Sequence, residues 1–564
     1  MKKKTFAGIA AIGALLGAAT AAGVVIHRQH IKRQLAAMNN KSLPPKRNIY
    51  FAGGGLAALS GAYYLIHDCN IPGDCIHIFE GSANIGGAFN VGGDAESGFI
   101  MTVPKLFSER NHANLMDMLS GIKSLSLPEL SVKEEIINYM NANPVCENAR
   151  LISADGQPTA HGFGLTKKTL NTIKSLLSAK DYAISAITVE DYFAQASELF
   201  NSNFWAIISS SYLLRRRSSA EEFKHILSCI SGEISELYTM KNVVRTQFNE
   251  QETVIAALEA YLKAHDVNFA THCSVVDAEF EEGTNRVVSI HLDDNGTQKT
   301  FYLNKNDLLF VTNGSSSECA TIGDYNYPAP VSDEIATSAA LWKKLAAKRD
   351  DMGAPEKFCD DSDSEMISFT ITAKSRLLLD RINELTGNDA VSGVLTTFKG
   401  SPWGLTISNI PQPYFAGQDD DITVICGYGT DPDAEGKYID KAMRYASGAE
   451  ILFELVKHLG LDDRWDEITE NIINVIPCAM PYATAPSLPY STGEKPLITS
   501  GDSGNMAFIG QFVKLGAGIS YSSEYTVRTA REAAYRLTGS KKSSTPPPRP
   551  IMSSYVKMFK ALKK

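Results

Sequence analysis

The sequence lacks the residue pairings that would define a disulfide framework or a metal site. Its nine cysteines are scattered, and no two of them form a C-x-x-C pair. An odd number of scattered cysteines is typical of reduced, mostly buried thiols in an intracellular protein. The eleven histidines show no ligand spacing with cysteines or carboxylates. We therefore expect no metal site.

Several common catalytic motifs are also absent. The sequence contains no G-x-S-x-G, no H-E-x-x-H and no G-x-x-x-x-G-K-[ST]. These absences exclude the usual signatures of an α/β-hydrolase, a zinc protease and a P-loop nucleotidase. No repeat of the solenoid type is present. At 564 residues the chain is too long for one core, so we expect roughly two to four domains.

Acidic residues are missing from both ends of the chain. Residues 1–47 carry nine lysines and arginines and no acid, and residues 541–564 carry seven and none. Setting these sixteen charges aside from the net charge of −9 leaves −25 for residues 48–540. The acidic body argues against a nucleic-acid partner. The basic ends suggest contact with an anionic membrane surface.

Charge is also absent from Thr5 to Ile26, a stretch about long enough to span a bilayer as a helix. Because His27-Arg28 follows it like a stop-transfer flank, we expect residues 1–47 to be a membrane anchor and linker, with the main domain in the cytoplasm. A cleaved signal peptide is the alternative. Residues 541–564 predict a basic amphipathic tail, which is either a solvated end or a membrane contact.

The clearest motif follows the N-terminal linker. A short buried strand at 48–52 leads into Gly53-Gly54-Gly55-Leu56-Ala57-Ala58, and a helical pattern continues to residue 66. This G-x-G-x-x-A between a strand and a helix predicts a Rossmann-type dinucleotide site. Gly53 allows the tight turn, Gly55 lets the backbone approach a pyrophosphate, and Ala58 lets the helix pack closely on the strand. The helix N-terminus then faces the phosphates.

Further patterns favour FAD over a nicotinamide cofactor. A second strand at 75–79 ends in Glu80, where an acid can accept hydrogen bonds from ribose hydroxyls. A glycine pair at 86–87, a buried strand ending at 313–314, and a strand at 506–512 before a helix are typical of flavoproteins. We therefore predict FAD, with these cofactor-binding residues: Gly53, Gly55, Leu56, Ala57, Ala58, Glu80, Gly86, Gly87, Val275, Asn313, Gly314 and Phe512.

These patterns predict an α/β fold in which the nucleotide domain is assembled from separated segments. We expect a Rossmann-type FAD-binding domain of the glutathione-reductase-like kind, with an inserted substrate domain that is helix-rich first and mixed second. The predicted FAD domain comprises residues 48–110, 235–325 and 495–540. The predicted substrate domain comprises residues 111–234 and 326–494.

Over about residues 48–540 the chain resembles the oleate hydratases, also called the myosin-cross-reactive antigen family. The residues that carry the resemblance are Ser202-Asn203-Phe204-Trp205, Phe310-Val311-Thr312-Asn313-Gly314, Pro355-Glu356-Lys357-Phe358-Cys359, Gln412-Pro413, Ile476-Pro477-Cys478-Ala479-Met480-Pro481-Tyr482 and Phe508-Ile509-Gly510-Gln511-Phe512. The resemblance implies an FAD protein, a homodimer, that adds water across the cis double bond of an unsaturated fatty acid. It also implies that the flavin organises and polarises the site.

The chain differs from this family where the resemblance implies catalytic residues. Leu106 stands at the position of the family's water-activating Glu. Glu109 is the nearby acid and our candidate catalytic residue, although it also fits a solvated carboxylate that opens a helix. The family's proton-donating Tyr, just after the Asn-Phe-Trp motif, has no counterpart before Tyr212. The candidate substrate-binding residues are Ser408, Asn409 and Gln412.

Three functions remain open from the sequence. The first is an FAD-dependent fatty acid hydratase with diverged catalytic positions. The second is a flavin oxidoreductase that acts on a lipid or another apolar substrate. The third is a non-catalytic paralogue that binds FAD and lipid. Family resemblance favours the first, whereas the changed catalytic positions favour the other two.

Overall fold

The structure is a computed structural model that describes residues 47–331, 336–359, 363–389, 392–501 and 504–563. The predicted membrane anchor and linker therefore lies, apart from Arg47, outside the described residues. Within the described ranges, no helix combines the length and the apolar character needed to cross a bilayer. None of the nine cysteines, all of which the structure describes, forms a disulfide.

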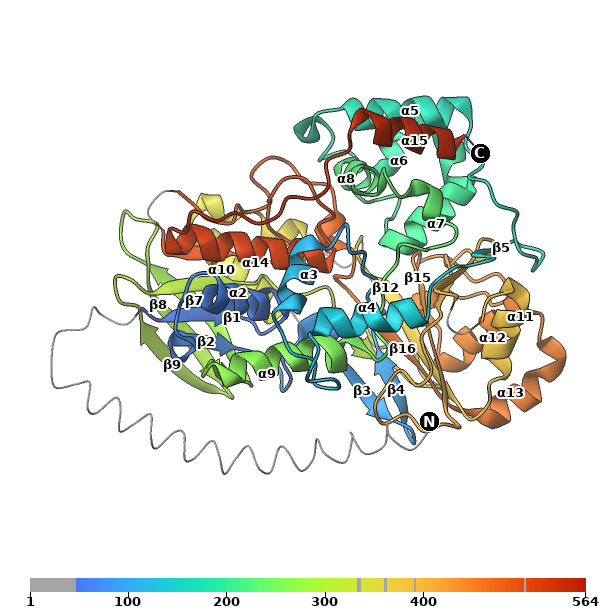
Figure 1. Ribbon diagram of the computed structural model, residues 1–564, viewed down its shortest axis with the longest axis horizontal. Helices are drawn as coiled ribbons and strands as arrows, with labels where there is room; N and C mark the ends of the chain where they lie inside the picture. The colour runs from blue at the N-terminus through green and yellow to red at the C-terminus, as the bar shows by residue number, and fades with distance from the viewer. Residues whose placement is uncertain (1–46, 332–335, 360–362, 390–391, 502–503, 564) are drawn as a thin grey trace.

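A five-stranded parallel sheet forms the centre of the nucleotide domain (Figure 1). Its strand order is β17-β10-β1-β2-β6. The strands are β1 (Ile49–Ala52), β2 (Ile76–Phe79), β6 (Asn268–Ala270), β10 (Leu308–Val311) and β17 (Met506–Phe508). Every residue of β1 and β10 is buried, as expected for strands that are covered on both faces. This confirms the predicted Rossmann-type domain.

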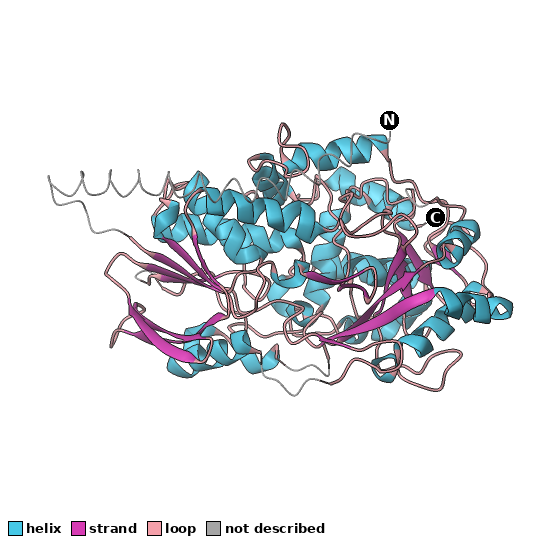
Figure 2. Ribbon diagram, turned by 90° about the horizontal axis from the view of Figure 1, so that it is seen from below, coloured by secondary structure: helices cyan, strands magenta, loops and turns pink. Residues whose placement is uncertain are grey.

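Helices and a second sheet cover the two faces of the parallel sheet (Figure 2). The helices α2 (Leu56–His67), α9 (Ala256–Ala264) and α14 (Ser523–Thr538) pack side by side. A three-stranded antiparallel sheet of β7 (Cys273–Phe280), β8 (Val287–Asp294) and β9 (Thr297–Tyr302) lies on the other face, where Phe301 contacts the rings of Tyr50 and Phe79. The helix α10 (Thr337–Lys348) packs against β7.

The second large sheet is mixed and has seven strands in the order β11-β16-β12-β15-β14-β13-β5. All its pairings are antiparallel except that of β13 with β5. The strands are β5 (Leu151–Ile152), β11 (Thr321–Ile322), β12 (Met366–Ala373), β13 (Leu395–Phe398), β14 (Thr406–Ser408), β15 (Thr423–Gly429) and β16 (Ile472–Met480). The hairpin of β3 (Val91–Asp94) and β4 (Gly98–Met101) packs against β12 and β16.

Further helices extend the second part of the molecule. The helices α11 (Leu377–Thr386), α12 (Gly448–Leu459) and α13 (Trp465–Asn471) share an apolar core with the mixed sheet. A separate helical group contains α5 (Lys167–Ser178), α6 (Val189–Tyr192), α7 (Asn203–Tyr212) and α8 (Ala220–Ile230). The C-terminal helix α15 (Met552–Leu562) lies beside α5 in this group (Figure 1).

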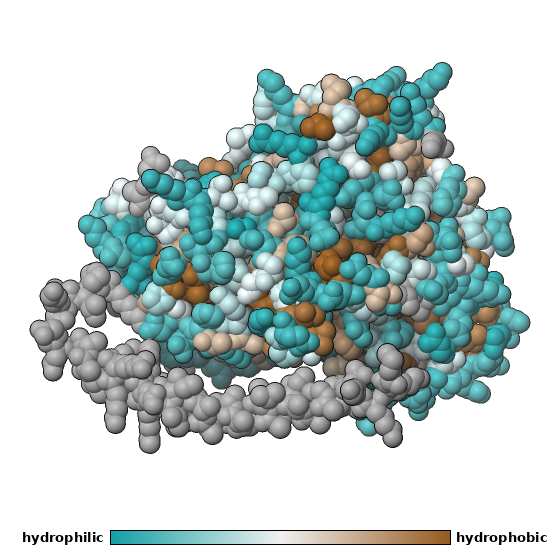
Figure 3. Space-filling view, viewed as in Figure 1, coloured by the Kyte–Doolittle hydropathy of each residue, from teal (hydrophilic) through white to brown (hydrophobic). Residues whose placement is uncertain are grey.

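The domain boundaries stay a prediction, but the packing places one segment clearly. The helices α3 (Ala113–Ser120) and α4 (Val132–Ala142) share the apolar core of the nucleotide domain, although the sequence grouped residues 111–234 with the substrate domain. Glu524 of α14 accepts hydrogen bonds from the backbone of Asn114 and Leu115 at the start of α3. The molecular face shown in Figure 3 is largely hydrophilic, with small, separated hydrophobic groups.

Candidate functional site

The turn between β1 and α2 forms one wall of a glycine cradle. Gly53 has a φ of +108°, and a Cβ added there would lie 2.4 Å from Oγ1 of Thr312. Only glycine therefore fits this turn without a shift of Thr312. Gly55 is the N-cap of α2, and no side chain caps the helix. The first N–H groups of α2 therefore have no intrahelical partner and favour an anion.

A second glycine turn closes the cradle from the opposite side. The backbone N–H of Gly86 donates to the carbonyl of Gly54 at 3.1 Å. A Cβ added to Gly87 would approach Cα of Gly55 to 3.3 Å. Because the glycines of the two turns have no side chains, the space between the turns can hold a flat or extended ligand. Sequence patterns predicted both turns, and the structure brings them together.

Polar groups surround this cradle. At the end of β2, the carboxylate of Glu80 accepts hydrogen bonds from the N–H of Gly54 at 2.7 Å and from Ser82 at 2.8 Å. Both side-chain polar atoms of Asn313 and the Oδ1 of Asn90 are buried without a hydrogen-bond partner among the described residues. Such orphaned groups are costly unless a ligand satisfies them. The cradle therefore fits a polar dinucleotide cofactor.

The cradle opens into a cavity of about 710 Å³. Most of the predicted cofactor-binding residues line it: Gly53, Gly55, Leu56, Ala57, Glu80, Gly86, Gly87, Val275, Asn313 and Gly314. An apolar part of the wall comes from residues 100–106, from the end of α7, and from Met366, Leu395, Tyr428, Cys478, Met480 and Ile519. Serines and threonines at 315–317, 337–338, 522–523 and 526 also line the cavity. One cavity thus joins a polar cofactor cradle to an apolar chamber.

The other predicted residues lie outside this lining. Ala58 is fully buried in α2, where its small side chain permits close packing. Phe512 packs against the rings of Trp342 and Phe358. The side chain of Glu109 is 55% exposed and lies 3.7 Å from Nζ of Lys133, which matches a solvated carboxylate. Glu109 is not among the residues that line the cavity.

Of the three predicted substrate-binding residues, Ser408 lines the cavity. The amide nitrogen of Asn409 donates to Oγ1 of Thr396 at 3.4 Å. The side chain of Gln412 bonds to the carbonyl and the N–H of Val424. Asn409 and Gln412 therefore hold their own loop together and do not face the chamber.

The cavity wall also contains ionisable residues that the sequence motifs did not predict as site residues, among them Lys105, His112, Glu318, Tyr428 and Tyr521. Burial lowers the pKa of Lys105, while the charge of Glu250 raises it. Burial lowers the pKa of His112 to about 4, so its ring is neutral. The only sequence signal for Lys105 is its place beside Leu106, the position that the family resemblance singled out.

Tyr212, which the sequence left without a role, ends α7 at the cavity wall. Burial raises its pKa, and the charge of Arg150 lowers it. Its hydroxyl has no hydrogen-bond partner in the described part of the chain. In contrast, the hydroxyl of Tyr428 donates to the carbonyl of Ser210 at 2.6 Å. Tyr212 is therefore a protonated phenol that is free to bond a ligand.

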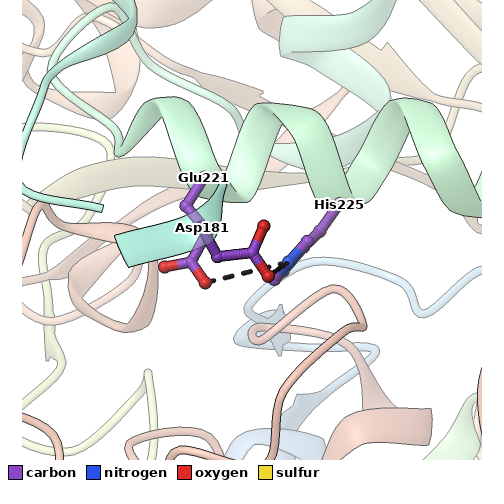
Figure 4. Close-up of side chains that lie close together, drawn as sticks. All are labelled: Asp181, Glu221 and His225. Carbon is purple, nitrogen blue, oxygen red and sulfur yellow. Dashed lines mark hydrogen bonds and ion pairs between the residues drawn. The ribbon is translucent and has the colours of Figure 1, made fainter. Parts of the chain in front are cut away.

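Figure 4 shows a cluster of ligand-type side chains, Asp181, Glu221 and His225, which are not among the residues that line the cavity. Nε2 of His225 is 3.4 Å from Asp181 and 3.8 Å from Glu221. Lys224 lies 2.7 Å from the carboxylate of Asp181, and Lys514 lies 2.6 Å from that of Glu221. Because two ammonium groups already neutralise both carboxylates, this cluster is best described as an ion-pair network.

The fold and the glycine cradle define a Rossmann-type flavoprotein. Among solved structures, putrescine oxidase has a TM-score of 0.52 at 11% identity, with 87% of this chain and 99% of that chain covered. A protoporphyrinogen oxidase-like protein from Exiguobacterium sp. 255-15 has a TM-score of 0.50 at 14% identity, with 89% and 100% covered. At these levels of sequence identity, the two structural similarities support the fold alone.

The chain belongs to the MCRA family, whose model matches residues 46–535. It is 30% identical over 505 residues to an oleate hydratase of Streptococcus pyogenes serotype M49 (strain NZ131), and the alignment covers 87% of this chain and 85% of the relative. It is 27% identical over 534 residues to a linoleate hydratase of Lactiplantibacillus plantarum, and the alignment covers 88% of this chain and 94% of the relative. The family resemblance seen in the sequence is confirmed. Since the family is FAD-dependent, the predicted cofactor FAD is confirmed as well.

Proposed function

We propose that the protein adds water across a cis double bond of an unsaturated fatty acid and so forms a hydroxy fatty acid. One observation carries the proposal: a single cavity joins the cofactor cradle to an apolar chamber that presents a free phenol. An acyl chain suits the apolar wall. The curated relatives named oleate hydratase and linoleate hydratase support the same substrate class.

The residues that would hold FAD are those of the cradle. The N-terminus of α2 and the backbone at Gly55 would meet the pyrophosphate, and Glu80 would accept hydrogen bonds from the ribose. When bound, FAD would polarise and organise the adjoining chamber. The remaining chemistry of the proposal belongs to side chains of this chain.

In this proposal Tyr212 donates the proton. Its O–H bond breaks, and the π electron pair of the alkene forms a new C–H bond. The neighbouring carbon then takes a lone pair from water, and the proton that this water loses restores the phenol. Arg150 would stabilise the phenolate in between, because its charge lowers the pKa of Tyr212, against the effects of burial and of the charge of Glu233, which raise it. Arg150 is held by the carbonyls of Ile207 and Leu237.

The test is incubation of the FAD-loaded protein with oleate or linoleate, followed by mass spectrometry of the lipids. We expect a product that is heavier by one water. Tyr212→Phe should lower the rate by about a hundredfold or more, as loss of a general acid does. Tyr182→Phe is the matched control, because Tyr182 is 72% exposed.

Two other outcomes would change the proposal. If Tyr212→Phe is as active as the parent, hydration stands and Tyr212 is not the acid. If the parent forms no hydroxy acid, while a nicotinamide cofactor reduces the flavin and a lipid reoxidises it, the protein is a flavin oxidoreductase. The N-terminal anchor, the homodimer and the cytoplasmic main domain stay predictions.

A further inference from the structure

The cavity wall carries a single lysine or arginine. Among its described lining residues, Lys105 is the only side chain of either type. The two acids on the wall are engaged elsewhere: Glu80 with Gly54 and Ser82, and Glu318 with the backbone N–H of Ser338 at 3.0 Å. The cavity thus presents one ammonium group for an anionic ligand.

The backbone around Lys105 is firmly held. Its own N–H donates to Oε1 of Glu250 at 2.8 Å. Three residues earlier, the hydroxyl of Thr102 donates to the carbonyl of Ala88 at 3.3 Å, beside the second glycine turn. These two contacts fix where the side chain starts. The lysine therefore starts from a segment that two hydrogen bonds anchor.

The ammonium itself lacks an anionic partner. Nζ lies 5.8 Å from the ring centroid of Phe89, and it has no hydrogen bond or ion pair among the residues that the structure describes. Glu250 acts on it only at longer range, because its carboxylate bonds the Lys105 backbone and the hydroxyl of Tyr414 at 3.2 Å. Lys105 is half-buried, and a cation that loses part of its hydration without such a partner is destabilised. An anion bound in the cavity would remove that cost.

A second polar group lies near the same wall. Ser408 faces Leu395 across the pairing of β13 with β14, and Leu395 belongs to the cluster against which Leu106 packs. All three residues line the cavity, and Leu106 is the chain neighbour of Lys105. The hydroxyl of Ser408 has no hydrogen-bond partner in the described residues. A charge and a free hydroxyl at one apolar wall suit the two oxygens of a carboxylate.

We propose that Lys105 is the carboxylate-binding residue of the chamber and selects for fatty acids over neutral lipids of the same length. This inference rests on the proposed substrate class, but it does not require that the acyl chain is hydrated. FAD phosphates are the other anions in reach. The cradle already offers the FAD phosphates the N-terminus of α2. Lys105, the only lysine or arginine among the described lining residues, is therefore available to a carboxylate.

The experiment compares dodecanoate with dodecanol in calorimetric titrations of the FAD-loaded protein. Neither ligand has a double bond, so binding is measured apart from catalysis. We expect the parent to bind dodecanoate more tightly. Lys105→Met should weaken dodecanoate binding about tenfold to a hundredfold, as for a lost charged hydrogen bond, and should leave dodecanol unchanged. Lys105→Arg should keep most of the preference.

Lys133→Met is the control, because Lys133 lies at the surface beside Glu109. If Lys105→Met does not fold, Lys105→Gln gives the same comparison. Equal weakening for both ligands would overturn the inference, since Lys105 would then only pack. Loss of bound FAD with an unchanged preference for dodecanoate would overturn it too, since Lys105 would face the cofactor. A Lys105-dependent preference without any hydration would support the inference and contradict the proposed function.

Discussion

His112 illustrates how the site controls a single ionisable side chain. Its Nδ1 accepts a hydrogen bond from the N–H of Ser108 at 3.1 Å, and the ring packs edge-on against Phe107. The residue is also the N-cap of α3, where a positive charge is unfavourable. Burial lowers its pKa to about 4 from 6.5. The folded protein therefore excludes the charged ring.

This exclusion predicts a pH dependence of stability. The pKa of His112 is lower in the folded protein than in the unfolded chain, so neutral His112 contributes its full share to the free energy of unfolding above pH 6.5. This share is lost as the pH falls from 6.5 toward 4, and the loss is at most about 3 kcal/mol. His112→Asn keeps a side-chain acceptor for the N–H of Ser108 but removes the group that titrates. We expect its melting temperature to fall less than that of the parent between pH 7 and pH 4.5. Parallel losses in the two proteins would contradict the prediction.

At this scale the sequence predicts the glycine turns of the cradle, but it does not predict which polar side chains line the rest of the cavity. Gly53 and Gly87 could be identified because their positive φ angles favour glycine, and Gly55 could be identified from its spacing within the same short pattern. Glu109 and Tyr212 could not be ranked, because a shift of a few residues along a loop decides whether a side chain faces the cavity. That direction depends on tertiary contacts, such as the surface pairing of Glu109 with Lys133.

At the scale of elements, the strand–turn–helix unit of β1 and α2 provides a direct test of cofactor binding. Gly55 has a φ of −77°, and an added Cβ would meet only Cα of Gly87 at 3.8 Å. Gly55→Ala should therefore fold normally, yet hinder the approach of a pyrophosphate. We expect at least a tenfold loss of FAD affinity, measured by absorbance after dialysis.

The matched control is Gly417→Ala, because a Cβ there would have nothing within 4 Å. Its FAD content should equal that of the parent. If Gly55→Ala also retains full FAD content, the backbone at Gly55 does not contact the cofactor.

The C-terminal helix α15 is a second element whose role the structure defines. Met558 and Leu562 are buried in the core of the helical group, whereas Met552 is 79% exposed. The preceding linker is also held, since the N–H of Thr545 donates to Oδ1 of Asn114 at 3.0 Å. The amphipathic tail could be predicted from its sequence spacing. Its docking surface could not, because that surface comes from residues more than 300 positions away.

We therefore expect Met558→Ala to release α15 from the helical group. Loss of a buried methionine costs about 2–5 kcal/mol, which is enough to undock an eleven-residue helix. Trypsin should then cut faster in the basic linker at residues 541–549. Met552→Ala, on the same helix but exposed, should be cut at the parent rate. Equal cleavage of all three proteins would show that α15 is not held by this contact.

At the scale of the whole molecule, the basic ends and the acidic body remain the main asymmetry. The described end, α15, carries Lys557 and Lys560 together with the exposed apolar residues Met552 and Val556, and the exposed Ile551 precedes the helix. The neighbouring α5 adds lysines and contains no acid. Docking of α15 therefore gathers positive charge and apolar side chains on one part of the surface, which is the pattern of an interfacial membrane contact.

This surface predicts selective binding to anionic vesicles. A variant without residues 1–46 should sediment with phosphatidylglycerol vesicles and not with phosphatidylcholine vesicles, because each lysine near an anionic surface contributes about 1 kcal/mol. Replacing Lys557, Lys560 and Lys563 by glutamine should remove most of the binding, as should high salt, which screens the charges. Binding of equal strength to both lipids would instead indicate a purely apolar contact. Absence of binding to either would leave the tail as a structural helix that serves only to cover the helical group.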